Sequence, residues 1–183
     1  MPRARRTRLI AAKRDDVWRV VSDPFQLPRW YPKVVRVEGV QERRRGSGTL
    51  WTKVLRTSGG RDVRADYRCL RSAEPSEYIW EQEIEGSPFA KVFKSAQTAI
   101  ALDEEGEGTR VTITVDQKLR GMSRTGGFMV RRATGQQLDD ALSSLASLFE
   151  DERADAAAPE SETPDREPPV SRPSLGEKRE LDA

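Results

Sequence analysis

Six stretches typical of β-strands follow one another through the middle of the sequence, and the connections between them are short. The stretches cover residues 34–42, 49–56, 62–73, 78–85, 93–102 and 109–119. The connections are rich in glycine, proline, serine and acidic residues, which favour turns. Parallel strands need connections of a dozen or more residues, and each of these is shorter. The sequence therefore predicts antiparallel hairpins that form a continuous meander.

The sequence before the meander predicts a further strand and two short helices. Residues 5–12 form the strand candidate, and residues 15–22 form a helix with an apolar side. Asp23-Pro24 then has the form of a helix N-cap followed by a proline in the first turn. A second short helix is therefore expected through about Trp30, and the sheet should contain seven strands.

A long amphipathic helix is expected after a glycine-rich stretch, residues 121–127, which we predict to be a loop. Within residues 128–149, Leu138, Leu142, Leu145 and Phe149 recur at spacings of 4, 3 and 4. Such spacing places them on one face of a helix. At 1.5 Å per residue the helix would be about 33 Å long. The expected fold class is α+β, with a curved seven-stranded antiparallel sheet closed over this helix.

The last part of the sequence differs sharply in composition from the rest. From Asp151 onward the chain has ten acidic and five basic residues, many prolines and few large apolar side chains. Too little apolar surface is present to offset the entropy of ordering the chain. We therefore predict one ligand-binding domain over residues 1–150 and a disordered, acidic, proline-rich tail over residues 151–183.

Charge gives little indication of a nucleic-acid partner. The net charge is +2, and the acidic tail leaves +7 on the first 150 residues. This body is only moderately basic, so no nucleic-acid partner is expected. Arg3, Arg5, Arg6 and Arg8 could contact phosphates or anionic lipid, but arginines in an edge strand also prevent edge-to-edge pairing. The second role needs no partner.

The absence of histidine and the presence of a single cysteine, Cys69, exclude several kinds of site. A Cys/His zinc site, a Ser-His-Asp triad, a Cys-His dyad and an intramolecular disulfide are all excluded. We expect no cofactor and no metal. The N-terminal residues do not resemble a signal peptide, and no stretch approaches the roughly 20 apolar residues of a membrane span. The expected location is the cytoplasm, without integral membrane association.

The order of these elements resembles that of a known superfamily. The most specific stretch is IAAKRDDVWRVVSDPFQLPRWYPKVVRVEGV, residues 10–40, in which the end of a strand is followed by the two short helices and the next strand. Together with the late helix of Leu138, Leu142 and Leu145, it resembles the START-like helix-grip superfamily (SRPBCC), which includes polyketide cyclase/dehydrase-like and Bet v 1-like proteins. The resemblance covers roughly residues 5–150. It implies a cavity between the sheet and the C-terminal helix, which relatives use for apolar molecules.

Nine residues are candidates for contacting a ligand in this cavity. They are Trp30, Tyr67, Trp80, Gln82, Phe93, Thr98, Gln117, Gly135 and Leu138. Aromatic rings can line an apolar pocket, and they can also simply fill a core. The polar strand residues share parity with apolar neighbours, so they should face inward, where each needs a ligand, water or another side chain as a partner.

Gly135 interrupts the long helix at a cost of about 1 kcal/mol relative to alanine. The missing side chain could leave room for a ligand between the helix and the sheet. Alternatively, the glycine packs closely against Trp80 or is a tolerated irregularity near the start of the helix.

Two functions are compatible with these observations. The first is binding or carriage of a hydrophobic small molecule, lipid or polyketide-like, without catalysis. The alternative is a polyketide cyclase/dehydrase-type enzyme acting on a bound poly-ketone, in which the acid or base would be a carboxylate, Tyr67 or an arginine-polarised group. No catalytic residue is identified. A third hypothesis is a stress or assembly protein whose acidic tail engages a partner, and a homodimer is among the oligomeric states left open.

Overall fold

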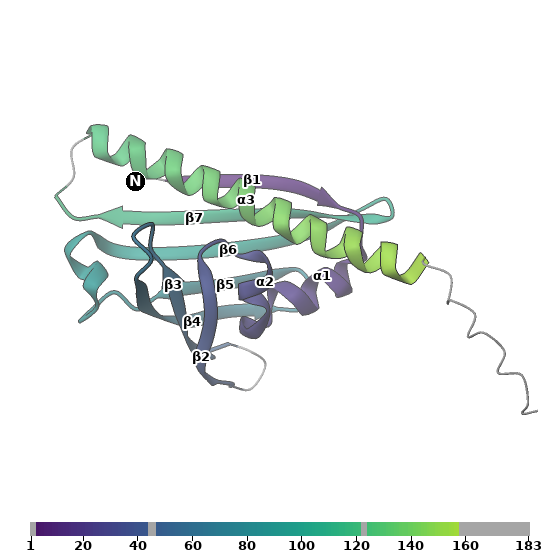
Figure 1. Ribbon diagram of the computed structural model, residues 1–183, viewed down its shortest axis with the longest axis horizontal. Coiled ribbons are helices and arrows are strands. Elements are labelled where there is room, and N and C mark those ends of the chain that lie inside the picture. Colours follow the sequence, from purple (N-terminus) through teal and green to yellow (C-terminus); the bar gives the residue numbers. More distant parts are fainter. Residues whose placement is uncertain (1–2, 44–46, 122–123, 158–183) are drawn as a thin grey trace, which may run out of the picture.

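Seven antiparallel strands form one curved sheet in the computed structural model, which describes residues 3–43, 47–121 and 124–157 (Figure 1). The strands are β1 (Arg3–Ile10), β2 (Val34–Gln41), β3 (Leu50–Arg56), β4 (Asp62–Ala73), β5 (Glu77–Gln82), β6 (Phe93–Glu105) and β7 (Gly108–Leu119). Their order across the sheet is β1-β7-β6-β5-β4-β3-β2. The predicted meander is therefore confirmed, and β1 joins it beside β7 at one edge.

The register of the sheet brings polar and aromatic residues of several strands onto one face. Tyr67 of β4 lies opposite Gln82 of β5. Thr98 of β6 lies opposite both Trp80 of β5 and Val115 of β7. Because directly paired residues point to the same side of an antiparallel sheet, these residues all lie on the concave face.

The two short helices after β1 form as the sequence predicts. Helix α1 (Arg14–Val21) buries Val17, Trp18 and Val21. A 3-10 turn, η1 (Pro24–Gln26), leads directly into α2 (Leu27–Trp30). The Asp23 carboxylate accepts a hydrogen bond of 2.9 Å from the backbone N–H of Phe25, so it caps this second segment. A further 3-10 turn, η2 (Pro88–Lys91), connects β5 to β6.

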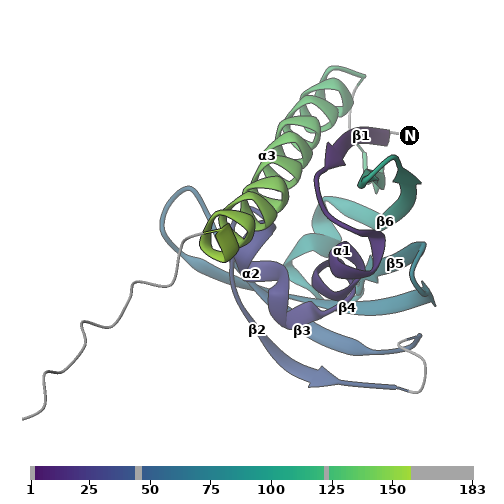
Figure 2. The same cartoon turned by 90° about the vertical axis from the view of Figure 1, so that its right-hand side faces the viewer.

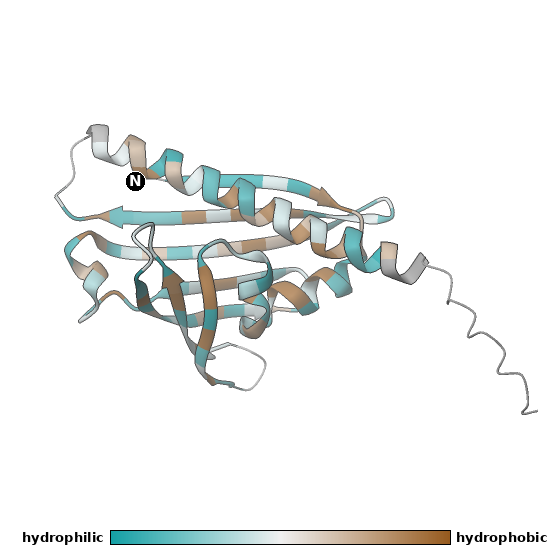
Figure 3. Ribbon diagram, viewed as in Figure 1, coloured by the Kyte–Doolittle hydropathy of each residue, from teal (hydrophilic) through white to brown (hydrophobic). Residues whose placement is uncertain are grey.

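The C-terminal helix α3 (Arg124–Ala157) lies beside β1 and packs mainly against β1 and α2 (Figure 2). Leu138, Leu142 and Leu145 are buried at this contact, as their spacing predicts. Figure 3 shows hydrophobic and hydrophilic residues alternating around α3 and along the strands. In the described residues, no helix is both long and apolar enough to cross a membrane.

The bounds of α3 differ from the expected ones at both ends. The helix begins at Arg124, within the stretch 121–127 that we expected to be a loop, so Gly126 and Gly127 are helical. At its other end the helix continues to Ala157, whereas the sequence suggested that the folded domain ends near Phe149. Charged residues after Phe149 suit a helix end that extends into solvent. The predicted tail beyond residue 157 lies outside the described residues.

Candidate functional site

All four tryptophans and all three tyrosines of the chain belong to one connected cluster of ring contacts in the interior. The members of this aromatic cluster are Trp18, Trp30, Tyr31, Trp51, Tyr67, Tyr78 and Trp80. They come from α1, from α2 and the residue after it, and from β3, β4 and β5. The Trp51 ring stacks on the Tyr67 ring with centroids 6.0 Å apart and meets the Trp80 ring edge-on at 6.2 Å.

Lys53 of β3 carries its amine into the middle of this aromatic cluster. The residue is only 2% exposed. Its Nζ lies 4.1 Å from the centroid of the Tyr67 ring, 4.6 Å from that of Trp80 and 4.8 Å from that of Tyr31. Such distances allow cation–π attraction when the amine is protonated. Within the described part of the chain, Lys53 forms no hydrogen bond or ion pair.

Burial changes the ionisation of the groups in this cluster. Removal from water lowers the pKa of the Lys53 amine to about 7, because the charged form loses its hydration. Burial raises the pKa of the Tyr31 hydroxyl to about 12, although a hydrogen bond with Thr98 acts in the opposite direction. Burial also raises the pKa of Tyr67. Near neutral pH the tyrosines are therefore neutral, and Lys53 is the group that can exchange a proton.

Several buried hydrogen-bond donors accompany Lys53. The indole Nε1 atoms of Trp30, Trp51 and Trp80 and the amide Nε2 of Gln82 are buried without an acceptor among the described residues. Buried polar groups in folded proteins normally have partners, since leaving one unpaired costs about 1–3 kcal/mol. The aromatic cluster therefore presents an excess of donors over acceptors.

Five of the nine predicted site residues lie in or beside the aromatic cluster. Trp30, Tyr67 and Trp80 are members of it, Gln82 is paired with Tyr67, and Thr98 bonds Tyr31. The structure thus brings together residues that are far apart in the sequence.

The other four predicted site residues lie elsewhere. Gln117 accepts a hydrogen bond of 3.3 Å from the Thr134 hydroxyl of α3, so it joins the sheet to the helix. Leu138 is fully buried in the apolar contact of α3. Phe93 stands half-buried at the start of β6 and makes no ring contact with the cluster in the described residues.

Gly135 makes room for an arginine. A Cβ atom at this position would lie 2.5 Å from Nη2 of Arg6, whose guanidinium also donates a 2.9 Å hydrogen bond to Asp139 one turn further along α3. The alternative of close packing against Trp80 is wrong, because the Arg6 side chain crosses from β1 into this space. The same side chain occupies the room that a ligand would need directly at Gly135.

Sequence reasoning missed Lys53 and Tyr31. A lysine in a strand is ordinarily expected to face solvent. The signal that could have found Lys53 was its parity with Trp51, two residues earlier in the same strand, which puts both side chains on one face. Tyr31 follows the last residue of α2, where no periodic pattern indicates a direction.

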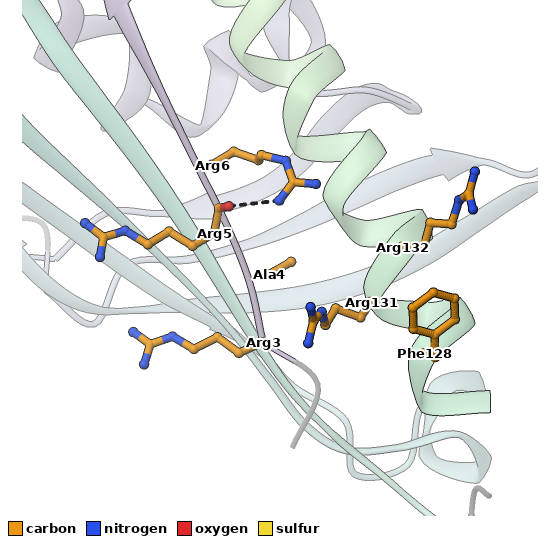
Figure 4. A pocket seen from close by; sticks show the side chains of 7 residues that line it. All are labelled: Arg3, Ala4, Arg5, Arg6, Phe128, Arg131 and Arg132. Carbon is orange, nitrogen blue, oxygen red and sulfur yellow. Dashed lines mark hydrogen bonds between the residues drawn. The ribbon is translucent and has the colours of Figure 1, made fainter. Parts of the chain in front are cut away.

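A separate hollow of about 460 Å³ lies at the surface between β1 and α3 (Figure 4). It is lined by Arg3, Ala4, Arg5, Arg6, Phe128, Arg131 and Arg132. Phe128 is 63% exposed there. β1 is an edge strand, so its arginines stand where edge protection was expected. None of the seven lining residues belongs to the aromatic cluster, and no group of three or more metal-ligating side chains occurs in the described residues.

Comparison with known proteins agrees with this architecture. The family model described as "Polyketide cyclase / dehydrase and lipid transport" matches residues 1–150. No curated protein matches the sequence. A START superfamily protein from Mycobacterium smegmatis has a TM-score of 0.68 at 15% identity, over 82% of this chain and 98% of that one.

Two further solved structures share the fold. The di-domain ARO/CYC protein StfQ from the steffimycin biosynthetic pathway gives a TM-score of 0.69 at 16% identity, over 84% of this chain and 52% of StfQ. A protein from Thermus thermophilus gives 0.59 at 23% identity, over 86% of this chain and all of that one. The predicted helix-grip fold is confirmed.

Proposed function

Because this chain belongs to the polyketide cyclase/dehydrase and lipid transport family, we propose that it binds a hydrophobic small molecule, lipid or polyketide-like, that carries oxygen acceptors. The site is the concave face of the sheet, at the aromatic cluster between the strands and the helices. The molecule is held there without being transformed.

The observation that carries this proposal is the set of buried donors without acceptors. The indole N–H of Trp80 and the amide N–H of Gln82 are buried without an acceptor among the described residues, and the amine of Lys53 lies among aromatic rings that provide apolar contact. A ligand with an apolar body would pack against the rings, and its carbonyl or hydroxyl oxygens would accept hydrogen bonds from these donors. A purely hydrocarbon ligand would leave every one of these donors unpaired.

Extraction of the purified protein tests the proposal. Native mass spectrometry and solvent extraction should find a co-purifying apolar compound with oxygen atoms. The neutral dye Nile red should show saturable binding with energy transfer from tryptophan, since all four tryptophans lie in the aromatic cluster. Absence of any extractable compound together with absence of saturable dye binding would overturn the proposal.

A pair of glutamine variants locates the site. Gln82→Leu removes a buried donor from the aromatic cluster, so it should weaken binding of the extracted compound several-fold. Gln136→Leu makes the same change at an exposed position of α3 and should leave binding unaltered. Equal effects of the two variants would place the ligand elsewhere on the protein.

A second candidate function, a cyclase-type enzyme acting on a poly-ketone, is favoured by one observation. The Lys53 amine can accept a proton near neutral pH, and the Tyr67 ring lies 4.1 Å from it. An amine can remove a proton from a carbon between two carbonyls while a tyrosine hydroxyl donates to a carbonyl oxygen.

The second function predicts turnover that depends on these two residues and on Gln82. Lys53→Met and Tyr67→Phe should each abolish cyclisation of a poly-ketone substrate, and Gln82→Leu should do the same, while the far-UV circular dichroism stays that of the wild type. Turnover should rise with pH through about 7, as Lys53 loses its proton. A bound poly-ketone recovered unchanged after prolonged incubation would exclude catalysis and leave the binding function in place.

A further inference from the structure

Lys53 imposes a cost on the fold, because no described residue supplies an acidic partner for its amine. Its amine is almost completely buried, and the rings around it cannot accept its hydrogen bonds as oxygen atoms would. A buried amine without an acidic partner opposes folding, since its charged form is poorly solvated there. A methionine would fill the same space without this cost. The position is therefore explained better by what Lys53 binds than by what it stabilises.

None of the groups that face Lys53 carries a negative charge. Tyr67 from β4 and Tyr31 from the end of α2 are the titratable side chains whose rings contact it, and neither supplies a negative charge near neutral pH. On its own sheet it is paired with Val37 of β2 and Ala65 of β4, both apolar. β5 contributes the Trp80 ring. None of these neighbours is an anionic oxygen, which is the partner that a buried ammonium ion needs.

We propose that the ligand is an apolar acid, and that Lys53 Nζ binds its acidic head, a carboxylate or an enolate of a 1,3-dicarbonyl compound, as an ammonium ion. This inference rests on the proposed function and adds the chemical class of the ligand. The aromatic cluster contacts the apolar body, and the Gln82 amide and the Trp80 indole N–H are further donors for the head.

Proton balance gives this proposal a signature. At pH 8 the buried amine of the free protein is mostly neutral, and a carboxylic acid in solution is ionised. Formation of the ion pair therefore takes up close to one proton from the buffer. The affinity for the acid should fall as pH rises above 7, by up to tenfold per pH unit, and the affinity for a neutral analogue should not change.

Two matched pairs of probes test the proposal by displacement of Nile red: dodecanoate against 1-dodecanol, and 2-naphthoate against 2-acetonaphthone. At pH 7 the acid of at least one pair should bind ten or more times more tightly than its neutral analogue. Lys53→Met should remove that preference, and Lys118→Met, at an exposed position of β7, should keep it. Titration calorimetry at pH 8 in two buffers of different ionisation enthalpy should show uptake of about one proton by the wild type and none by Lys53→Met.

The outcomes separate the two proposals. Equal affinity for acid and neutral analogue in the wild type, or a preference that survives in Lys53→Met, overturns the role of Lys53 and leaves the binding function standing. Displacement by none of the four probes, when Nile red itself binds, also overturns the assignment of an acid ligand. Failure of Nile red to bind, together with the absence of any extractable compound, overturns the proposed function and this inference with it. Should Lys53→Met fold poorly, Lys53→Gln gives the same comparison.

Discussion

The concave face of the sheet has two halves that differ in chemistry. The half formed by β1, β6 and β7 under α3 is aliphatic, and its buried residues include Ile10, Ile100, Leu102, Val111, Ile113, Leu138, Leu142 and Leu145. The half formed by β3, β4 and β5 near α2 contains the aromatic cluster and Lys53. The first half packs against the long helix α3, and the second is joined by ring contacts to Trp18 of α1 and to Tyr31 after α2.

The polar groups of the two halves show what this difference means. In the aliphatic half, the buried Thr109 hydroxyl donates a 2.8 Å hydrogen bond to the carbonyl of Ala12, so this polar group has its partner within the protein. In the aromatic half, three indole nitrogens and the Gln82 amide are buried without an acceptor among the described residues. Burial is what lowers the pKa of the Lys53 amine, which lies among the rings of the same half. The aliphatic half therefore maintains the fold, and the aromatic half contains unpaired hydrogen-bond donors that a ligand can satisfy.

The largest expected effect concerns the aliphatic half. Leu142→Ala should lower the free energy of unfolding by about 2–5 kcal/mol, because the residue is 2% exposed and truncation leaves a cavity. Urea unfolding measures this change, with Leu9→Ala, 54% exposed, as a control of small effect. The folded fraction of Leu142→Ala should still bind Nile red with wild-type affinity. A matching loss of binding would contradict the division into two halves.

The next effect concerns pH and Lys53. The pKa of this amine is about 7 in the folded protein and close to 10.4 in the unfolded chain, so the unfolded chain binds more protons between these values. Stability of the wild type should therefore increase with pH, by about 2–3 kcal/mol from pH 6 to pH 9.

Lys53→Met should remove this rise and make the protein more stable than the wild type at pH 6. Urea midpoints measured across that range check the prediction, and Lys118→Met should keep the wild-type slope. A slope unchanged by Lys53→Met would show that the amine is not confined to the interior of the aromatic half.

The smallest effect is expected where α3 crosses β1. Gly135→Ala gains about 1 kcal/mol of helix propensity but displaces the Arg6 guanidinium from Asp139. The net change in the free energy of unfolding should stay within about 1 kcal/mol. In an Arg6→Ala background the same substitution should be clearly stabilising. Ligand affinity should be unchanged in both, and a large loss would extend the site into the aliphatic half.

Local signals in the sequence were enough for the fold. Turn residues at short intervals set the meander, Asp23-Pro24 set the second helix, and the spacing of Leu138, Leu142 and Leu145 set the buried face of α3. Each of these depends on residues close together in the chain, where periodicity and capping act.

The site was less accessible to such reasoning because its contacts are long-range. Arg6 and Gly135 meet through the packing of α3 on β1, and no local pattern relates them. Lys53 was missed because the preference of lysine for solvent outweighed the strand parity that points it inward. Strand parity did indicate Tyr67, Gln82 and Thr98, which lie in or beside the aromatic cluster.

Nuclear magnetic resonance of protein labelled with [6-13C]lysine tests the central claim most directly, because the chain has only seven lysines and Lys53→Met assigns the signal. The Lys53 signal should titrate near pH 7 in the free protein. With dodecanoate or 2-naphthoate bound, its pKa should rise by one or more, and the neutral analogues should not raise it. The account would be contradicted by a Lys53 signal that titrates like those of the exposed lysines, or by a Lys53 pKa that neither acid raises.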